Sequence, residues 1–183
     1  MRIISGSKRG MNLETPDGLD TRPTSDRIKE TLFNMIAPDV YDSYFLDLFS
    51  GSGQIGIEAL SRGAREAIFI EKDKRAISCI EKNLSKAKFL DIGKLYKEDV
   101  YSALHKLSGH ASFDIVFMDP PYNKSIEKQV LEALAKSDFI SEDTLIIVEA
   151  SLETDFDYVI DLGYEIIKSK LYKTNKHIFL KKA

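Results

Sequence analysis

The sequence predicts an α/β protein built on a doubly wound, mostly parallel sheet of seven strands. Short apolar runs alternate with amphipathic helical segments from residue 44 onward. The runs are almost continuously apolar, which is typical of strands that are buried on both faces of a parallel sheet. Residues 164–182 read as two further strands joined near Lys173 to Lys176, so an antiparallel strand is expected at the C-terminal edge.

The N-terminal part predicts a small extension. Residues 2–15 alternate weakly and favour a hairpin through Gly6 to Gly10. A helix is expected to follow, capped by Thr24 or Ser25 and stopped by Pro38. We therefore divide the chain into an extension at residues 1–38 and a main domain at residues 39–183.

The main domain is expected to alternate strands and helices. A strand–helix order with short connections is typical of a doubly wound sheet, in which ligands bind beyond the carboxyl ends of the strands. The expected strands are residues 44–50, 67–71, 94–98, 113–119 and 144–150, and the expected helices are 54–62, 73–88, 100–107 and 126–134.

Composition limits the classes of function. The chain has 183 residues, of which 43% are apolar and 30% charged, as in ordinary globular domains. No apolar run approaches the length of a membrane span, and Cys79 is the only cysteine. We expect a cytoplasmic monomer without a disulfide. The histidines lack ligand spacing, so no metal site is expected: His105, His110 and His177.

Charge is unevenly distributed. The net charge of −3 argues against a general nucleic-acid coat protein. Residues 168–183 nevertheless contain six lysines and no acid, and the first ten residues are also basic. Two basic ends on an acidic body leave room for a localised phosphate-binding face, and the alternative is an ordinary solvated surface.

A glycine-rich loop follows the first strand of the main domain. Gly51, Gly53 and Gly56 fit the pattern G-x-G-x-x-G between a strand and a helix, and Glu71 lies twenty residues beyond Gly51. Glycines allow a tight turn and close backbone approach, and an acid at that distance can accept hydrogen bonds from ribose hydroxyls. The pattern indicates a nucleoside cofactor and does not choose between NAD and S-adenosylmethionine.

Two more carboxylates stand at strand ends. Glu71, Asp99 and Asp119 each follow an expected strand, on the side where such sheets bind ligands. Asp99 could accept a hydrogen bond from an adenine amino group. The alternative is that it only caps the helix that follows it.

The stretch FMDPPYN, residues 117–123, places an acid, two prolines and an aromatic ring directly after a strand. The carboxylate of Asp119 and the carbonyl of Pro120 can both accept hydrogen bonds from an exocyclic amino group. Holding both N–H groups lets the nitrogen lone pair point at an electrophilic methyl group. The prolines stiffen the acceptors, and Tyr122 offers a face for a planar base. A hydride transfer needs no such set.

These motifs resemble a known family. DLFSGSG with DPPY is similar to the class I S-adenosylmethionine-dependent amino-methyltransferases. The combination of RPTSDRIKETLFN, DLFSGSGQIGIEALSRGA, IEKDKRA and MDPPY resembles, more narrowly, the bacterial 16S rRNA methyltransferases that modify N2 of guanine 966. The likeness runs in order from RIISG to the VEAS stretch at residues 148–151.

The resemblance implies a Rossmann-like class I methyltransferase fold, S-adenosylmethionine as cofactor, and roles for particular residues. It implies that three groups of residues form the site. The cofactor-binding group is Asp47, Gly51, Gly53, Glu71, Asp99 and Val100. The catalytic group is Asp119, Pro120 and Tyr122. The substrate-binding group is Arg22, Thr24, Arg27, Pro121 and Tyr122.

The implied partner is 16S rRNA or an assembling small ribosomal subunit. The target guanine would have to leave its stacked setting to reach Asp119. For Arg27, the alternative is a surface salt bridge with Glu30 or Glu14. Departures from the family pattern are Met11-Asn12 after Gly10, which weakens the case for RNA contacts from the hairpin, and Tyr172-Lys173 in the last turn.

Three other functions fit part of the pattern. A DNA adenine-N6 methyltransferase would use the same DPPY chemistry, but no separate target-recognition domain fits into 183 residues. An NAD-dependent oxidoreductase leaves DPPY unexplained. A non-catalytic RNA-binding factor for ribosome assembly would have no need of intact cofactor residues.

Overall fold

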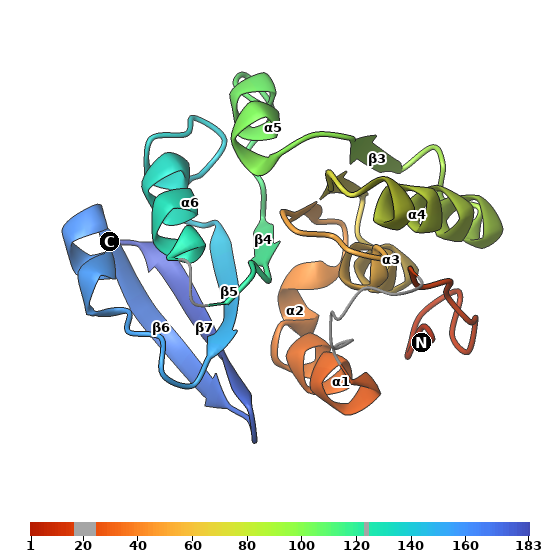
Figure 1. Cartoon of the computed structure of the whole chain (residues 1–183), viewed down its shortest axis with the longest axis horizontal. Helices are drawn as coiled ribbons and strands as arrows, with labels where there is room; N and C mark the ends of the chain where they lie inside the picture. Colours follow the sequence, from red (N-terminus) through yellow and green to blue (C-terminus); the bar gives the residue numbers. More distant parts are fainter. Residues whose placement is uncertain (17–24, 123–124) are drawn as a thin grey trace.

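A computed structural model describes residues 1–16, 25–122 and 125–183 of the chain. Its centre is a seven-stranded sheet in the order β3-β2-β1-β4-β5-β7-β6 (Figure 1). β7 runs antiparallel to both of its neighbours, and the other pairings are parallel. The strands are β1 Tyr44–Asp47, β2 Glu66–Ile70, β3 Gly93–Tyr96, β4 Ile115–Met118, β5 Leu145–Ser151, β6 Tyr164–Leu171 and β7 Asn175–Lys182.

Helices cover both faces of the sheet (Figure 1). Apolar side chains of α5, α6 and η1 pack against one face, and those of α1, α3 and α4 pack against the other. The helices are α1 Asp26–Met35, α2 Ala37–Val40, α3 Gln54–Ser61, α4 Lys74–Ala87, α5 Val100–Lys106, α6 Ile126–Ala135 and the 3-10 helix η1 Asp157–Leu162. None of the helices in the described ranges is long and apolar enough to cross a membrane.

The predicted elements are present, with two differences. Pro38 does not simply end a helix: α1 ends at Met35, and Pro38 lies in the first turn of α2. Proline fits there because the first amide groups of a helix have no acceptor within it. The short helix η1 was not predicted, since its six residues are too few to show a helical periodicity.

The first residues form a small hairpin closed by an isolated bridge between Arg2 and Asn12. Gly6 is pressed against the end of α3, where a Cβ atom would come within 1.8 Å of the Ser61 carbonyl oxygen. Ile3 and Leu13 belong to the same apolar cluster as residues of α1 and α3. The hairpin therefore packs on the main core.

A buried carboxylate, Glu58, holds the N-terminal extension against α3. Glu58 of α3 accepts hydrogen bonds from the amides of Ile4 and Ser5 at 2.8 and 3.0 Å. It also pairs with Arg62 at 2.8 Å and with Lys29 of α1 at 3.5 Å. Glu58 and Lys29 are both fully buried, and each has charged or backbone partners that compensate for lost water.

Candidate active site

Four acidic residues occupy the carboxyl ends of four adjacent strands. Asp47 ends β1, Glu71 follows β2, Asp99 lies just beyond β3 and Asp119 follows β4. Because the strand order is β3-β2-β1-β4, the four residues form a row along one edge of the sheet: Asp99, Glu71, Asp47, Asp119. The sheet thus brings together residues that are up to 72 positions apart in the sequence.

The loop between β1 and α3 has the backbone that its glycines allow. Gly51 and Gly53 have φ angles of +54° and +79°, which other residues rarely adopt. The Cβ position of Gly51 faces open space, with no atom within 4 Å among the described residues. Gly56 has a packing role, since a Cβ atom there would come within 2.3 Å of the Phe69 ring.

Asp47 is buried and only half satisfied. Its Oδ2 accepts a hydrogen bond from the Gly56 amide at 3.1 Å, whereas its Oδ1 has no hydrogen-bond partner in the described part of the chain. Burial raises the pKa of Asp47 to about 7, the Gly56 amide lowers it, and the charge of Glu71 raises it further. The site therefore holds a carboxylate that would gain from a nearby positive charge.

Glu71 connects the glycine loop to the next strand. Its Oε2 accepts a hydrogen bond from the Gly51 amide at 2.9 Å, and its Oε1 accepts from the amides of Lys72 and Asp73 at 2.8 Å each. Each carboxylate oxygen can accept two hydrogen bonds, so Oε2 can still accept a bond from a ligand hydroxyl group.

Asp99 caps α5, as the alternative in the sequence analysis proposed. Its carboxylate accepts hydrogen bonds from the amides of Tyr101 and Ser102 and from the Ser102 hydroxyl at 2.6 Å. The Ser102 hydroxyl is the largest cause of the lowered pKa of Asp99. A cap does not exclude an adenine contact, which stays a prediction. Val100 is buried in the apolar cluster that includes Leu48.

The DPPY loop leaves the sheet next to this row. Pro120 is buried, Pro121 is exposed, and the Tyr122 side chain is 40% exposed. Burial, followed by the charges of Glu149 and Asp47, raises the pKa of Asp119 well above its ordinary value. Burial is also the main cause of the raised pKa of Tyr122. The loop therefore presents an acid and an aromatic ring together at the edge of the sheet.

Behind the DPPY loop lies a polar cluster that was not predicted from the sequence. Glu149 of β5 accepts hydrogen bonds from the Tyr122 hydroxyl at 3.3 Å, from Asn175 Nδ2 at 2.5 Å and from His177 Nε2 at 3.0 Å. The Tyr172 hydroxyl lies 3.1 Å from His177 Nδ1. The available signal was a lone acid or histidine inside an apolar strand, in TLIIVEA and KHIFL.

The predicted substrate-binding residues are only partly within the described structure. Arg22 and Thr24 lie outside the described residues. Arg27 is exposed on the first turn of α1, and it forms no ion pair with any residue that the structure describes. The alternative, a salt bridge from Arg27 to Glu30 or Glu14, is absent among the described residues, and Glu14 instead pairs with Lys82 at 3.3 Å.

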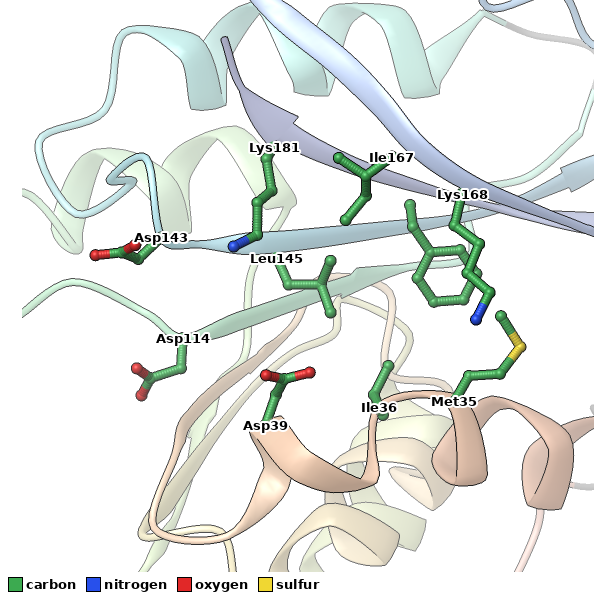
Figure 2. Close-up of a pocket in the computed structure, with 10 residues that line it drawn as sticks. Met35, Ile36, Asp39, Asp114, Asp143, Leu145, Ile167, Lys168 and Lys181 are labelled. Carbon is green, nitrogen blue, oxygen red and sulfur yellow. The ribbon is translucent and has the colours of Figure 1, made fainter.

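One hollow lies elsewhere, at the opposite ends of the strands. It has a volume of about 450 Å³ and lies between the α1–α2 junction and strands β6 and β7 (Figure 2). Figure 2 shows Lys168 and Lys181 on the strand side and Ile36 and Asp39 on the helix side. Its lining includes none of the predicted site residues, so we do not assign the active site to it.

The residues present fit a cationic nucleoside cofactor. The unpaired Oδ1 of buried Asp47 lies beside the glycine loop, and the loop borders open space at Gly51. The adjacent Glu71 has acceptor capacity for ribose hydroxyls. Within the described ranges there is no group of three or more side chains that could hold a metal ion.

The strand order, the inverted β7 and the acidic row define the class I fold of S-adenosylmethionine-dependent methyltransferases. Comparison with solved structures agrees. The structure of yhhF from Escherichia coli superimposes with a TM-score of 0.87 at 34% identity, covering 100% of this chain and 97% of the other.

The particular family follows from the sequence comparisons. The family model described as Conserved hypothetical protein 95 matches residues 1–181. YlbH of Bacillus subtilis is 40% identical over 156 residues, which is 85% of each chain. Ribosomal RNA small subunit methyltransferase D of Escherichia coli K12 is 37% identical over 153 residues, covering 84% of this chain and 76% of the relative. The chain belongs to the family described as Conserved hypothetical protein 95.

Proposed function

We propose that this protein transfers a methyl group from S-adenosylmethionine to the exocyclic N2 of a guanine in 16S rRNA, at guanine 966. The observation that carries the proposal is the row of carboxylates that ends beside the DPPY loop. The name of the Escherichia coli relative, a small-subunit rRNA methyltransferase, supports ribosomal RNA as the substrate class.

In this proposal, the cofactor residues hold and orient one reactant. Asp99 and Val100 would hold the adenine, Glu71 would hold the ribose hydroxyls, and Gly51 and Gly53 would hold the methionine end. Asp47 is a buried carboxylate without a cationic partner in the described chain, which suits the positively charged end of such a ligand. S-adenosylmethionine supplies the electrophilic methyl group.

The DPPY loop orients the other reactant. The Asp119 carboxylate and the Pro120 carbonyl accept hydrogen bonds from the two N–H groups of the guanine amine, and the Tyr122 ring stacks on the base. The amine nitrogen would form a bond to the methyl carbon while the bond from that carbon to the cofactor sulfur breaks, which leaves a neutral thioether, and the amine would lose one proton. Because the pKa of Asp119 is raised, this carboxylate is suited to accept that proton.

We assign contact with the RNA backbone to the extension at residues 1–38 and catalysis to residues 39–183. Arg27 is exposed and forms no ion pair with the residues that the structure describes, which supports this assignment, as does the basic hairpin that packs on α3. Positive side chains beside the site would hold the RNA while the target base is extruded toward Asp119. We propose that the protein acts as a cytoplasmic monomer and needs no metal.

Methyl transfer from labelled S-adenosylmethionine tests the proposal. The label would be offered separately to unmodified 16S rRNA, to assembled small subunits and to duplex DNA, and modified nucleosides identified by mass spectrometry. We expect N2-methylguanosine in RNA. Label in DNA adenine would keep the DPPY chemistry and overturn the substrate. Cofactor binding without transfer to any of the three would favour a non-catalytic assembly factor.

A further inference from the structure

Glu149 is a buried carboxylate at the active-site edge that the proposed chemistry does not use. Its residue is only 4% exposed, and its three hydrogen-bond donors carry no obligatory positive charge: Tyr122, Asn175 and His177. No lysine or arginine pairs with it in the described part of the chain. A buried carboxylate without such a cation is costly, so a function is expected to offset the cost.

Both oxygens of Glu149 are already engaged. Oε1 accepts from Tyr122 and Asn175, and Oε2 accepts from His177. Since a carboxylate only accepts, His177 must carry a proton on Nε2, and its Nδ1 can then accept from the Tyr172 hydroxyl. Because Glu149 is only 4% exposed and already holds Tyr122, Asn175 and His177, it is poorly placed to bind a base itself and well placed to hold its neighbours.

The neighbours come from the inverted strand. β7 pairs with β5 so that His177 lies opposite Glu149, and Asn175 lies opposite Ser151. His177 is fully buried and Asn175 is 5% exposed. The Glu149 carboxylate is thus fixed by β7 on one side, while the Tyr122 hydroxyl approaches it from the DPPY loop.

We propose that Glu149 is a positioning residue for methyl transfer, which anchors Tyr122 through the Glu149–His177–Tyr172 chain and faces Asp119 as a second negative charge. This inference rests on the proposed function. The bond to the Tyr122 hydroxyl fixes the ring plane on which the base stacks. The charge of Glu149 also favours the positive charge that develops on the amine nitrogen as the methyl group arrives.

The pH dependence of turnover gives a readout that a purely structural role would not change. The titratable groups that face Asp119 are Asp47 from β1, Glu149 from β5 with His177 behind it, and Tyr122 from its own loop. The negative charge of Glu149 helps to keep the pKa of Asp119 high. Without that charge, the acid limb of the kcat/KM profile should move to lower pH.

The main test is Glu149→Gln, which keeps the shape of the side chain and removes its charge. We expect kcat to fall about 10- to 100-fold, as is usual when a reacting group loses its orientation. S-adenosylmethionine affinity should be unchanged, since Glu149 contacts none of the proposed cofactor residues. The acid limb of kcat/KM should shift to lower pH. Unchanged kcat and an unmoved acid limb would overturn the proposal.

A double-mutant cycle tests the connection to Tyr122. If the hydroxyl acts through Glu149, Tyr122→Phe and Glu149→Gln should be strongly non-additive, and the double variant should be little worse than Glu149→Gln alone. Additive losses would mean that the two residues act independently. Tyr122→Phe also keeps the proposal testable if Glu149→Gln fails to fold.

A matched pair of tyrosines controls for general loss of buried hydrogen bonds. Tyr172→Phe removes the bond to His177, and we expect a several-fold loss of kcat with little change in melting temperature. Tyr164→Phe removes a buried bond to the Leu131 carbonyl at the other end of β6, 3.0 Å long, and should leave kcat unchanged. Equal effects of the two variants on kcat would contradict the proposed chain.

Failure of the inference and failure of the proposed function look different. If wild-type protein methylates no RNA guanine at N2, the proposed function is wrong. If wild-type protein does so and Glu149→Gln matches it in kcat and in pH profile, only the role of Glu149 is wrong.

Discussion

Glu58 and Glu149 are both buried carboxylates, and their surroundings differ. Glu58 is fully buried and is compensated by two cations, Lys29 and Arg62, and by two backbone amides. Glu149 is 4% exposed and, among the described residues, has no cationic partner other than His177, which is charged only if protonated. Burial is the main cause of the raised pKa of Asp119, and the charge of Glu149 adds to that of Asp47 in raising it further.

The comparison therefore separates two clusters. The structural cluster is Glu58 with Lys29 and Arg62, and the acidic site cluster is Asp47, Asp119 and Glu149. The cations around Glu58 satisfy it in the folded chain alone, so that it can tie the hairpin to α1 and α3. Asp47, Asp119 and Glu149, in contrast, have no lysine or arginine partner among the described residues, and a positive charge on a ligand or on a reacting nitrogen would compensate them. Uncompensated buried charge of one sign is typical of functional sites, because stability alone would remove it.

The largest effect on turnover is expected from substitution of Asp119, in the acidic site cluster. Asp119→Ala should lower kcat by about 1,000-fold or more, because the amine loses its charged acceptor, with S-adenosylmethionine affinity nearly intact. Single-turnover methylation and calorimetric binding would measure the two quantities. A comparable loss of affinity would mean that Asp119 serves the cofactor.

Asp114→Asn is the matched control for this variant. Asp114 lies at the opposite end of the same strand, where it is exposed and accepts a hydrogen bond from the Tyr44 amide at 2.7 Å. Its substitution should leave turnover unchanged.

Substitution of Glu58, in the structural cluster, should instead change stability. Glu58→Gln leaves Lys29 buried without its counter-charge and should cost about 3–5 kcal/mol in the free energy of unfolding. Urea unfolding measures this cost. The folded fraction should keep its kcat at saturating RNA. A stability close to that of the wild type would show that the two cations do not compensate Glu58 as proposed.

Asp47 should show the opposite sign in stability. Burial raises its folded-state pKa to about 7, above the ordinary value of 3.8, so its contribution to stability is greatest below the unfolded pKa and is lost as pH rises through the folded pKa. The shift corresponds to roughly 4 kcal/mol at most. Asp47→Asn should therefore raise the melting temperature at pH 7.5 and flatten its decline between about pH 4 and 7.

The same variant should bind S-adenosylmethionine more weakly, because the buried negative charge is lost. Differential scanning fluorimetry across pH, with and without the cofactor, measures both effects. If Asp47→Asn lowers stability and leaves cofactor binding unchanged, Asp47 does not belong to the acidic site cluster.

The smallest effect on activity is expected from substitution of Arg27, which lies outside both clusters. Arg27→Ala should raise the KM for RNA modestly, leave kcat unchanged, and reduce the salt slope of RNA binding by about one unit. Arg65→Ala is the control, since Arg65 is also an exposed arginine, lies just before β2 and is paired with Asp42. Equal changes for the two variants would mean that Arg27 has no particular place on the RNA.

Much of this protein could be predicted from local patterns. Strands β1, β2 and β4 are short apolar runs, and each is followed by a glycine loop or an acid that the sequence displays directly. Asp47, Gly51, Glu71 and Asp119 could therefore be assigned to one edge of the sheet, because all carboxyl ends of parallel strands lie together. The backbone angles of Gly51 also follow from its residue type.

Only the tertiary structure decided which buried charges meet. Glu149, Asn175 and His177 come together because β7 turns back and pairs with β5 in one particular register. Glu58 meets Lys29 because the hairpin and α1 pack on α3. Periodicity and turn residues are local properties that a sequence displays, whereas strand register and helix packing depend on contacts between distant segments.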